Sequence, residues 1–297
     1  MNTMKKEKVN FYNPVTGQKM AGLLFLPADF DSTRKYAAIV ATGPMLSLKE
    51  IAQRKYAVRL AESGFVTLTF DFTHFGESEG TPRQLENPFK HNLDYSAAIS
   101  FLQNLPYVDA HRIGGIGMCA SGSYVAVASS FDKRMKAVVS IVPALTDLGA
   151  SLMVPLETVK EHHAKFEANE GPVTYMDMMP FNPPAGVPVF EQGHDYYYTD
   201  RNPRPDWDSR AVDWSEEQWM GYSPVEFVKN LEAPYLVVTG DKAFSYEASK
   251  MVFDNAASKD KEMLVVKGAG HFELYDMDPY MGEALEKIVH FFRNNLK

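Results

Sequence analysis

The sequence predicts an α/β fold, with a mostly parallel central sheet flanked by helices and a cap inserted between two of the strands. Three observations predict it. Short apolar runs alternate with segments of helical periodicity in the first half of the chain, and the same alternation returns after residue 224. Between these parts, residues 148–224 are rich in Pro, Met and aromatic residues and lack a regular period. A chain of 297 residues, 45% of them hydrophobic, is long enough to bury a large core.

Each predicted element follows from its own local pattern. Strands are expected where apolar runs are short and bounded by turn residues, and helices where apolar side chains recur every three or four positions. The runs that predict strands occupy residues 19–28, 36–43, 65–72, 112–118, 136–144, 233–240 and 261–268. The segments that predict helices occupy residues 48–64, 92–105, 245–256 and 282–296. Residues 1–147 and 225–297 therefore form the expected core, and residues 148–224 the expected cap or lid.

Charge and composition narrow the classes of function. The formal net charge is −8 at pH 7, and an acidic chain repels phosphate backbones, so we expect no nucleic-acid partner. The first residues include lysines with no apolar run behind them, and no window approaches the roughly 18 apolar residues of a membrane span. The single cysteine excludes an internal disulfide and a cysteine zinc cage. We expect a cytoplasmic protein that acts on a small molecule and needs no metal, cofactor or membrane partner. The sequence is also compatible with a homodimer.

The stretch "RIGGIGMCASGSYVAVA", residues 112–128, holds the candidate nucleophile. A buried strand runs directly into a helix there, and a sharp turn of this kind at the carboxyl edge of a sheet can expose a reactive side chain. With Cys119 at the tip, Gly117 and Ser121 supply the small residues that the crowded turn needs on either side. Placing Ser121 at the tip provides no glycine, so Cys119 is favoured and Ser121 is expected to help cap the helix. The alternative is a lone cysteine that is only a buried apolar residue.

A general base is expected late in the chain. His271 follows the last predicted strand in a glycine-rich loop, which allows its ring to reach the edge of the sheet. The acid that orients it is harder to choose. Asp241 comes directly after the penultimate strand and is the first choice, while Asp147 and Glu247 are alternatives. A cysteine–histidine pair can also function with a weaker orienting group, so a carboxylate is not strictly required.

An oxyanion hole requires backbone N–H groups directed to the place where negative charge develops. One N–H is expected from Ala120, the residue after the nucleophile. The second is expected from the loop after the strand at residues 36–43, where Pro44 has no N–H to donate and Met45 is therefore the better candidate.

These residues resemble the α/β-hydrolase superfamily and, within it, the dienelactone-hydrolase-like branch. The segments "DFTHFGESEGTPRQLENP", "VDAHRIGGIGMCASG", "APYLVVTGDKAFS" and "KGAGHFELYD" follow one another in the family's order. The resemblance implies an α/β-hydrolase fold and a Cys119–His271 pair with Asp241 as the acid. The chain departs from the pattern at Ser121, which replaces the second glycine of the elbow, and at Ala243, which occupies the usual position of the acid.

The expected reaction is hydrolysis of an ester, thioester or lactone of a small carboxylic acid through an acyl-enzyme on Cys119. Two alternatives are an acyltransferase that uses the same nucleophile and a non-catalytic binding protein of the same fold. Aromatic residues of the cap are candidates for an acyl pocket, although each is more readily explained by packing within the cap. They are Tyr196, Tyr197, Tyr198, Trp207, Trp214 and Trp219.

Overall fold

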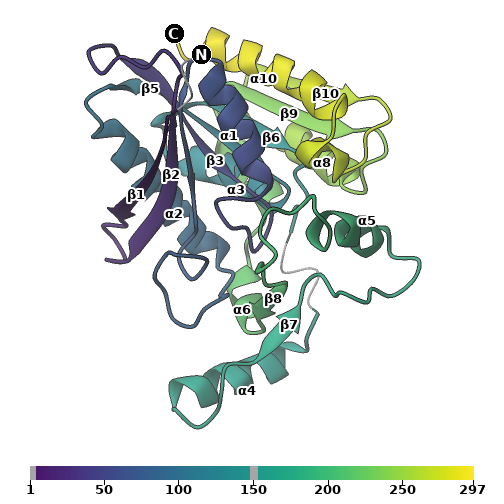
Figure 1. The fold of residues 1–297 in the computed structure, drawn as a ribbon. Helices are drawn as coiled ribbons and strands as arrows, with labels where there is room; N and C mark the ends of the chain where they lie inside the picture. Colours follow the sequence, from purple (N-terminus) through teal and green to yellow (C-terminus); the bar gives the residue numbers. More distant parts are fainter. Residues whose placement is uncertain (1–4, 148–152) are drawn as a thin grey trace.

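The computed structural model describes residues 5–147 and 153–297, in which eight strands form one sheet (Figure 1). The order across the sheet is β1-β2-β4-β3-β5-β6-β9-β10. The strands are β1 (Lys5–Tyr12), β2 (Lys19–Leu26), β3 (Tyr36–Thr42), β4 (Val66–Phe70), β5 (Val108–Met118), β6 (Met135–Ile141), β9 (Tyr235–Gly240) and β10 (Lys261–Val266). The pairings from β4 to β10 are parallel, and β2 pairs antiparallel with both β1 and β4. The predicted α/β fold with a mostly parallel sheet is confirmed.

Helices cover both faces of this sheet. They are α1 (Ala52–Glu62), α2 (Pro88–Gln103), α3 (Ala120–Phe131), α7 (Pro224–Phe227), α8 (Tyr246–Asn255), α9 (Glu273–Asp276) and α10 (Tyr280–Asn295), with a 3₁₀ turn, η2, at Val228–Asn230. Helices α1 and α10 contact each other on one face, and α2 and α3 contact each other on the other (Figure 1). Because the central strands are covered on both sides, they are largely apolar, as in β3, where all seven residues are buried.

The first strand is an exception that the sequence analysis did not predict. In β1 five of the eight residues are exposed, and only Phe11 is buried. The strand lies at the edge of the sheet and pairs in register with β2 from Lys5 opposite Leu26 to Tyr12 opposite Lys19. An edge strand with one solvent-exposed face needs few apolar residues, so the hydrophobic pattern of the sequence alone does not reveal it.

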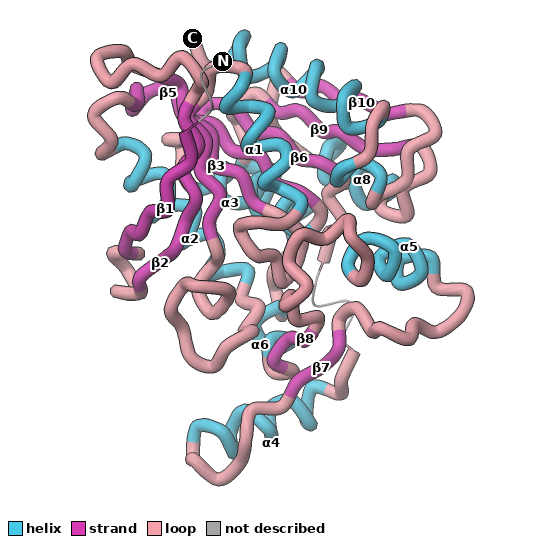
Figure 2. Tube along the Cα trace, in the orientation of Figure 1, coloured by secondary structure: helices cyan, strands magenta, loops and turns pink. Residues whose placement is uncertain are grey.

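Between β6 and α7 the chain leaves the sheet and forms what we call the inserted segment, residues 153–223. Its elements are α4 (Leu156–Glu167), β7 (Tyr175–Asp177), α5 (Pro188–Tyr197), β8 (Arg210–Val212) and α6 (Ser215–Trp219). Strands β7 and β8 form a separate antiparallel pair. These short elements gather at one end of the main sheet (Figure 2). Within the described ranges, none of the helices combines the length and apolar character needed to cross a membrane.

Candidate active site

Cys119 lies at the sharp turn between β5 and α3. Its backbone has φ 58° and ψ −121°, a conformation that side-chain-bearing residues rarely adopt and that is found at strained functional turns. A Cβ on Gly117 would lie 1.9 Å from the backbone oxygen of Ser121, so a glycine is required there. The backbone N–H of Cys119 donates to the carbonyl of Ile141 at 2.9 Å, which fixes the turn to β6. The strand, turn and helix therefore present the Cys119 side chain at the edge of the sheet.

Ser121, the rival position, is fully buried in the first turn of α3. Within the described part of the chain its Oγ has no hydrogen-bond partner, so the expectation that the Ser121 hydroxyl would help to cap this helix is wrong. The side chain of Cys119, by contrast, is only partly buried and lines a cavity. Of the two candidates, only Cys119 is accessible to a reactant.

The backbone N–H groups of Met45 and Ala120 lie beside the sulfur of Cys119, where they act to lower the pKa of its thiol. The loop after β3 carries Met45, and its next residue, Leu46, has a left-handed φ of 60°. The carbonyl of Leu46 accepts a hydrogen bond from the indole Nε1 of Trp207 at 3.0 Å. The inserted segment thereby holds the loop that places the Met45 N–H beside the sulfur. These are the two N–H groups that the sequence analysis selected for an oxyanion hole.

His271 lies between β10 and α9 and is fully buried. Its ring stacks against Phe244, with ring centres 4.2 Å apart, and packs edge-on against Phe272. The Nδ1 atom lies 2.7 Å from the Oγ of Ser245, and the Nε2 atom lies 3.1 Å from the hydroxyl oxygen of Tyr275. Both ring nitrogens therefore have neutral hydroxyl partners.

The three carboxylates considered as the acid lie elsewhere. Asp241 is exposed, and its Oδ1 accepts a hydrogen bond from the backbone N–H of Gly268 at 2.6 Å. Glu247 is exposed in the first turn of α8, and Asp147 is exposed in the loop after β6. The partner that the structure gives to Nδ1 is Ser245, so in this geometry Asp241 does not orient His271. Asp241 follows β9 immediately and turns toward the neighbouring loop, whereas Ser245 sits at the N-terminus of α8, beside the ring.

Tyr275 is the site residue that the sequence analysis missed. It lies in the short helix α9, four residues after His271, and is fully buried. Its hydroxyl lies 3.1 Å from Nε2 of His271, and its side chain lines the same cavity as Cys119 and Tyr197. The only local signal in the sequence is the spacing of four residues from His271, which places two side chains on one side of a helical turn.

Burial dominates the electrostatics of this site. It lowers the pKa of His271 from 6.5 to about 3, because no negative charge lies beside the ring to offset the loss of solvent. Burial also raises the pKa of the Cys119 thiol, and the neighbouring Tyr275 side chain and the N–H groups of Ala120 and Met45 only partly oppose this. At neutral pH both groups are therefore uncharged, so the resting site holds a thiol and a neutral imidazole instead of an ion pair.

The cavity beside Cys119 has a volume of about 90 Å³ and is lined almost entirely by apolar side chains. On the core side it is bounded by the Pro44–Leu46 loop, by Phe244, and by Phe272 and Tyr275. The inserted segment supplies the rest of the lining: Met178, Met179, Val189, Tyr197 and Trp207. Such a cavity suits an apolar acyl group better than a charged one.

The other aromatic residues singled out in the inserted segment serve its packing. Tyr198 donates its hydroxyl hydrogen to the carbonyl of Met179, and Trp219 donates to the carbonyl of Glu86. Trp214 belongs to a small separate apolar cluster under α4. Of the six residues named in advance, only Tyr197 and Trp207 line the cavity, where their rings stack 4.1 Å apart.

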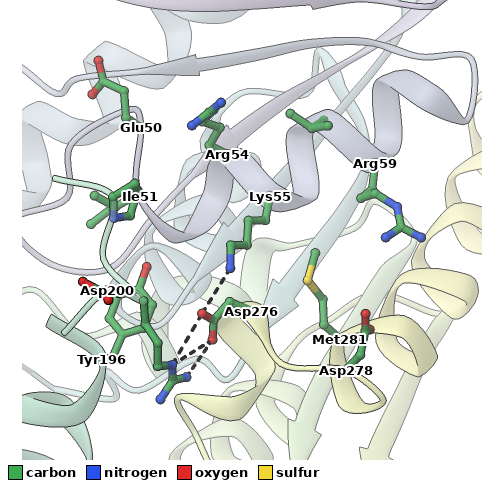
Figure 3. A pocket seen from close by; sticks show the side chains of 13 residues that line it. Glu50, Ile51, Arg54, Lys55, Arg59, Tyr196, Asp200, Asp276, Asp278 and Met281 are labelled. Carbon is green, nitrogen blue, oxygen red and sulfur yellow. Dashed lines mark hydrogen bonds and ion pairs between the residues drawn. The ribbon is translucent and has the colours of Figure 1, made fainter. Parts of the chain in front are cut away.

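A second cavity, of about 480 Å³, is lined by Tyr196 and lies between α1, α9 and the inserted segment (Figure 3). Figure 3 shows Lys55 directed toward Asp276, the residue after Tyr275. Arg201 forms an ion pair with the same carboxylate at 2.7 Å. Arg201 also donates to the carbonyl of Phe272 at 2.7 Å. Through Arg201 the inserted segment holds the turn that carries His271 and Tyr275. Among the described residues, no cluster of three or more His, Cys, Asp or Glu side chains could hold a metal ion.

The fold and the strand–turn–helix at Cys119 are those of an α/β hydrolase, and comparisons with known proteins agree. The chain belongs to the alpha/beta hydrolase family, whose sequence model matches residues 45–283. The crystal structure of the hypothetical protein PA2218 from Pseudomonas aeruginosa superposes with a TM-score of 0.89 and is 30% identical, covering 100% of this chain and 95% of that one.

Several relatives have names that state an activity. The polyketide transferase claH of Penicillium crustosum is 26% identical over 98% of this chain and 97% of its own length. A thiohydrolase of Eupenicillium brefeldianum is 24% identical over 93% of this chain and 91% of its own length. The family therefore includes relatives named for hydrolysis and for group transfer.

Proposed function

We propose that this protein hydrolyses thioesters of small or medium apolar carboxylic acids through an acyl-enzyme on Cys119. The observation that carries this proposal is the geometry at the turn: Cys119 has a strained backbone, is partly exposed and lines an apolar cavity. The backbone N–H groups of Met45 and Ala120 lie beside its sulfur. Donors fixed in this way stabilise an oxyanion without reorganising during the reaction.

The reaction has two steps. In the first, the thiol proton of Cys119 passes toward His271 while the sulfur attacks the carbonyl carbon, and the oxyanion accepts hydrogen bonds from Met45 and Ala120. The carbonyl re-forms as the leaving group departs with a proton, which leaves a thioester on Cys119. In the second step His271 removes a proton from water, the hydroxide attacks the acyl carbon, and the sulfur of Cys119 departs and is protonated again.

A cysteine nucleophile favours thioesters over oxygen esters. In the tetrahedral intermediate of a thioester, the two sulfur leaving groups have similar pKa values, so either departs readily. With an ordinary oxygen ester, the alkoxide is far more basic than the sulfur of Cys119, and the intermediate tends to revert. The thiohydrolase among the relatives supports the same preference. By the same argument, esters with acidic leaving groups should also acylate Cys119. Ordinary alkyl esters, and lactones of the kind that the dienelactone-hydrolase-like resemblance implies, are expected to react more slowly.

We further propose that residues 148–224 act as a cap on this site, with residues 148–152 outside the described part of the chain. Two contacts support this role. The Trp207 indole binds the loop of Met45, and Arg201 binds the turn that carries Tyr275. Since five cavity-lining residues also come from this segment, its packing decides which acyl groups fit.

Acyl transfer to an alcohol or amine is the second candidate. The apolar lining of the cavity favours it, because few groups there can hold a water molecule for the second step. The relative named as a polyketide transferase points the same way. The acyl-enzyme is common to both reactions, which differ only in the acceptor that reaches it.

Turnover of acyl thioesters of N-acetylcysteamine tests the proposal. We expect release of the free thiol by the wild-type protein, a strong preference over the matching ethyl ester, and loss of turnover in Cys119→Ala. Added alcohols and amines distinguish transfer from hydrolysis through the acylated product. A Cys119→Ala variant with wild-type turnover would contradict the proposal, and the absence of turnover with any thioester or activated ester would favour a binding protein.

A further inference from the structure

The lining of the cavity beside Cys119 differs in exposure from one side to the other. Phe244 is 41% exposed and marks the open side, whereas Met179 is 8% exposed and Phe272 is 3% exposed. Cys119 itself is only partly buried. An apolar acyl chain attached to the sulfur leaves water by extending toward the buried lining, so the residues there set how long the chain can be.

The volume of this cavity limits the acyl group. At about 90 Å³ it equals roughly three water molecules, each of which takes a share of about 30 Å³ in the liquid. A methylene or methyl group occupies a volume similar to that of a water molecule. The cavity therefore fits an acyl chain with about three carbon atoms beyond the carbonyl, as in a butanoyl group.

The aromatic part of the buried lining is held firmly. Tyr197 stacks on Trp207 with ring centres 4.1 Å apart, and the Trp207 indole donates to the carbonyl of Leu46 at 3.0 Å. The ring of Phe272 packs edge-on against the ring of Tyr197, with their centres 6.1 Å apart. Met179 differs from these residues, because an unbranched thioether side chain has three rotatable bonds and adapts its shape to its surroundings.

Gly193, in the interior of α5, leaves the space that the end of the Met179 side chain occupies. A Cβ at position 193 would lie 2.5 Å from Sδ and 2.6 Å from Cε of Met179, and 3.3 Å from Cζ of Phe272. Gly193 has no left-handed φ, so its backbone conformation does not require glycine, and glycine is a poorer helix former than alanine. The close contact between the backbone of α5 and the thioether explains the glycine instead.

We propose that Met179, positioned by Gly193, is the specificity-determining residue that limits the substrates to short acyl groups of up to about four carbons. This proposal rests on the proposed function, because it concerns the acyl group that Cys119 carries. The thioether closes the buried end of the cavity, and the free space beside it is the cavity that it lines. A side chain added at position 193 pushes the thioether into that space, whereas a shorter side chain at position 179 extends the cavity.

Turnover of straight-chain acyl thioesters of N-acetylcysteamine tests this limit. We expect the wild-type kcat/KM to be highest for butanoyl and to fall about 100-fold for hexanoyl, because each methylene that does not fit costs about tenfold or more. Met179→Ala should raise the ratio of hexanoyl to butanoyl turnover about tenfold. Gly193→Ala should lower the ratio of butanoyl to acetyl turnover about tenfold. Such ratios do not depend on how much of a variant is folded, because both substrates meet the same sample.

Met176→Ala is the matched control. Met176 is a buried methionine of β7 in the same inserted segment, but it does not line the cavity, so both ratios should stay at their wild-type values. The double variant Met179→Ala/Gly193→Ala should behave as Met179→Ala does, because the added Cβ no longer meets a thioether. If Met179→Ala and Met176→Ala give the same ratios, Met179 does not set the limit.

A second measurement needs no turnover. Cys119 is the single cysteine of the chain, so the mass of the protein reports its labelling. Alkyl methanethiosulfonates attach an alkyl chain to the sulfur as a disulfide and release methanesulfinate. Relative to free N-acetylcysteine, the hexyl reagent should label the wild type at least about tenfold more slowly than the butyl reagent, and Met179→Ala should remove this difference. Equal rates for the two reagents in the wild type would contradict the limit.

The two proposals fail separately. Labelling that depends on chain length, without turnover of any thioester, would overturn the proposed function and leave the cavity limit in place. Turnover that is lost in Cys119→Ala but shows no preference for short acyl chains would overturn only the role of Met179 and Gly193.

Discussion

The Oγ of Ser245 lies 2.7 Å from Nδ1 of His271, on the side of the ring where a carboxylate would stabilise a positive charge. A hydroxyl can orient the imidazole but cannot offset the cost of burying the imidazolium ion. The site therefore depends on neutral reactants, with charge appearing only during the reaction. The predictions below follow from this arrangement.

The pH dependence of acylation should lack the acid limb that a histidine with an ordinary pKa produces. Burial lowers the pKa of His271 to about 3, so the ring remains unprotonated and able to accept a proton from pH 7 down to about pH 4. We expect kcat/KM for a thioester substrate to stay nearly level between pH 4.5 and 7. A loss of activity with a midpoint near pH 6.5 would contradict this picture of the resting site.

Substitution Ser245→Asp should restore the acid limb. The added carboxylate beside Nδ1 raises the pKa of His271, so the ring becomes protonated as the pH falls toward the ordinary histidine range. The same charge favours the Cys119 thiolate and should speed alkylation by iodoacetamide at pH 7 by about tenfold. Ser245→Ala is the matched control, because it removes the hydrogen bond without adding charge, and it should show neither effect. If Ser245→Asp and Ser245→Ala give the same pH profile, the electrostatic interpretation fails.

The sequence predicted those parts of the site that depend on local pattern. Cys119 and His271 follow apolar runs that form β5 and β10, and parallel strands bring their carboxyl ends to one edge of the sheet. The partners of His271 depend instead on tertiary packing. Ser245 and Tyr275 meet the ring because of how α8 and α9 are oriented, and neither residue type signals that role. The edge strand β1 was missed for a related reason, since only Phe11 in it is buried.

Removal of the Met45 N–H should impair catalysis with little change in the cavity. Met45→Pro deletes one of the two donors beside the sulfur, and the loss of one oxyanion donor lowers kcat by about 100-fold or more. Met45→Leu keeps the N–H and a side chain of similar volume, so it should retain most of the activity. Single-turnover kinetics of both variants measure the difference. Similar rates in the two variants would show that the Met45 N–H does not bind the oxyanion.

Arg201 should matter for both stability and activity. Its side chain is 20% exposed and pairs with Asp276, which is 5% exposed, so the ion pair is largely shielded from solvent. We expect Arg201→Met to lower the free energy of unfolding by about 2 kcal/mol, a loss between those measured for exposed and for buried ion pairs. We also expect kcat to fall, because the turn that carries Tyr275 is displaced. The exposed pair of Arg210 with Asp208 is the control, and Arg210→Met should cost less than about 1 kcal/mol. Equal losses in urea unfolding would contradict a special role for Arg201.

The most direct measurement is the mass of the protein quenched in acid within milliseconds of mixing with an acyl thioester, followed by peptide mapping. The account predicts one added acyl group, located on the peptide that contains Cys119, which decays as free acid or acylated acceptor is released. Product formation with no mass added at Cys119 would contradict the account. So would an acyl group on another residue, if that group forms and decays at the rate of product release.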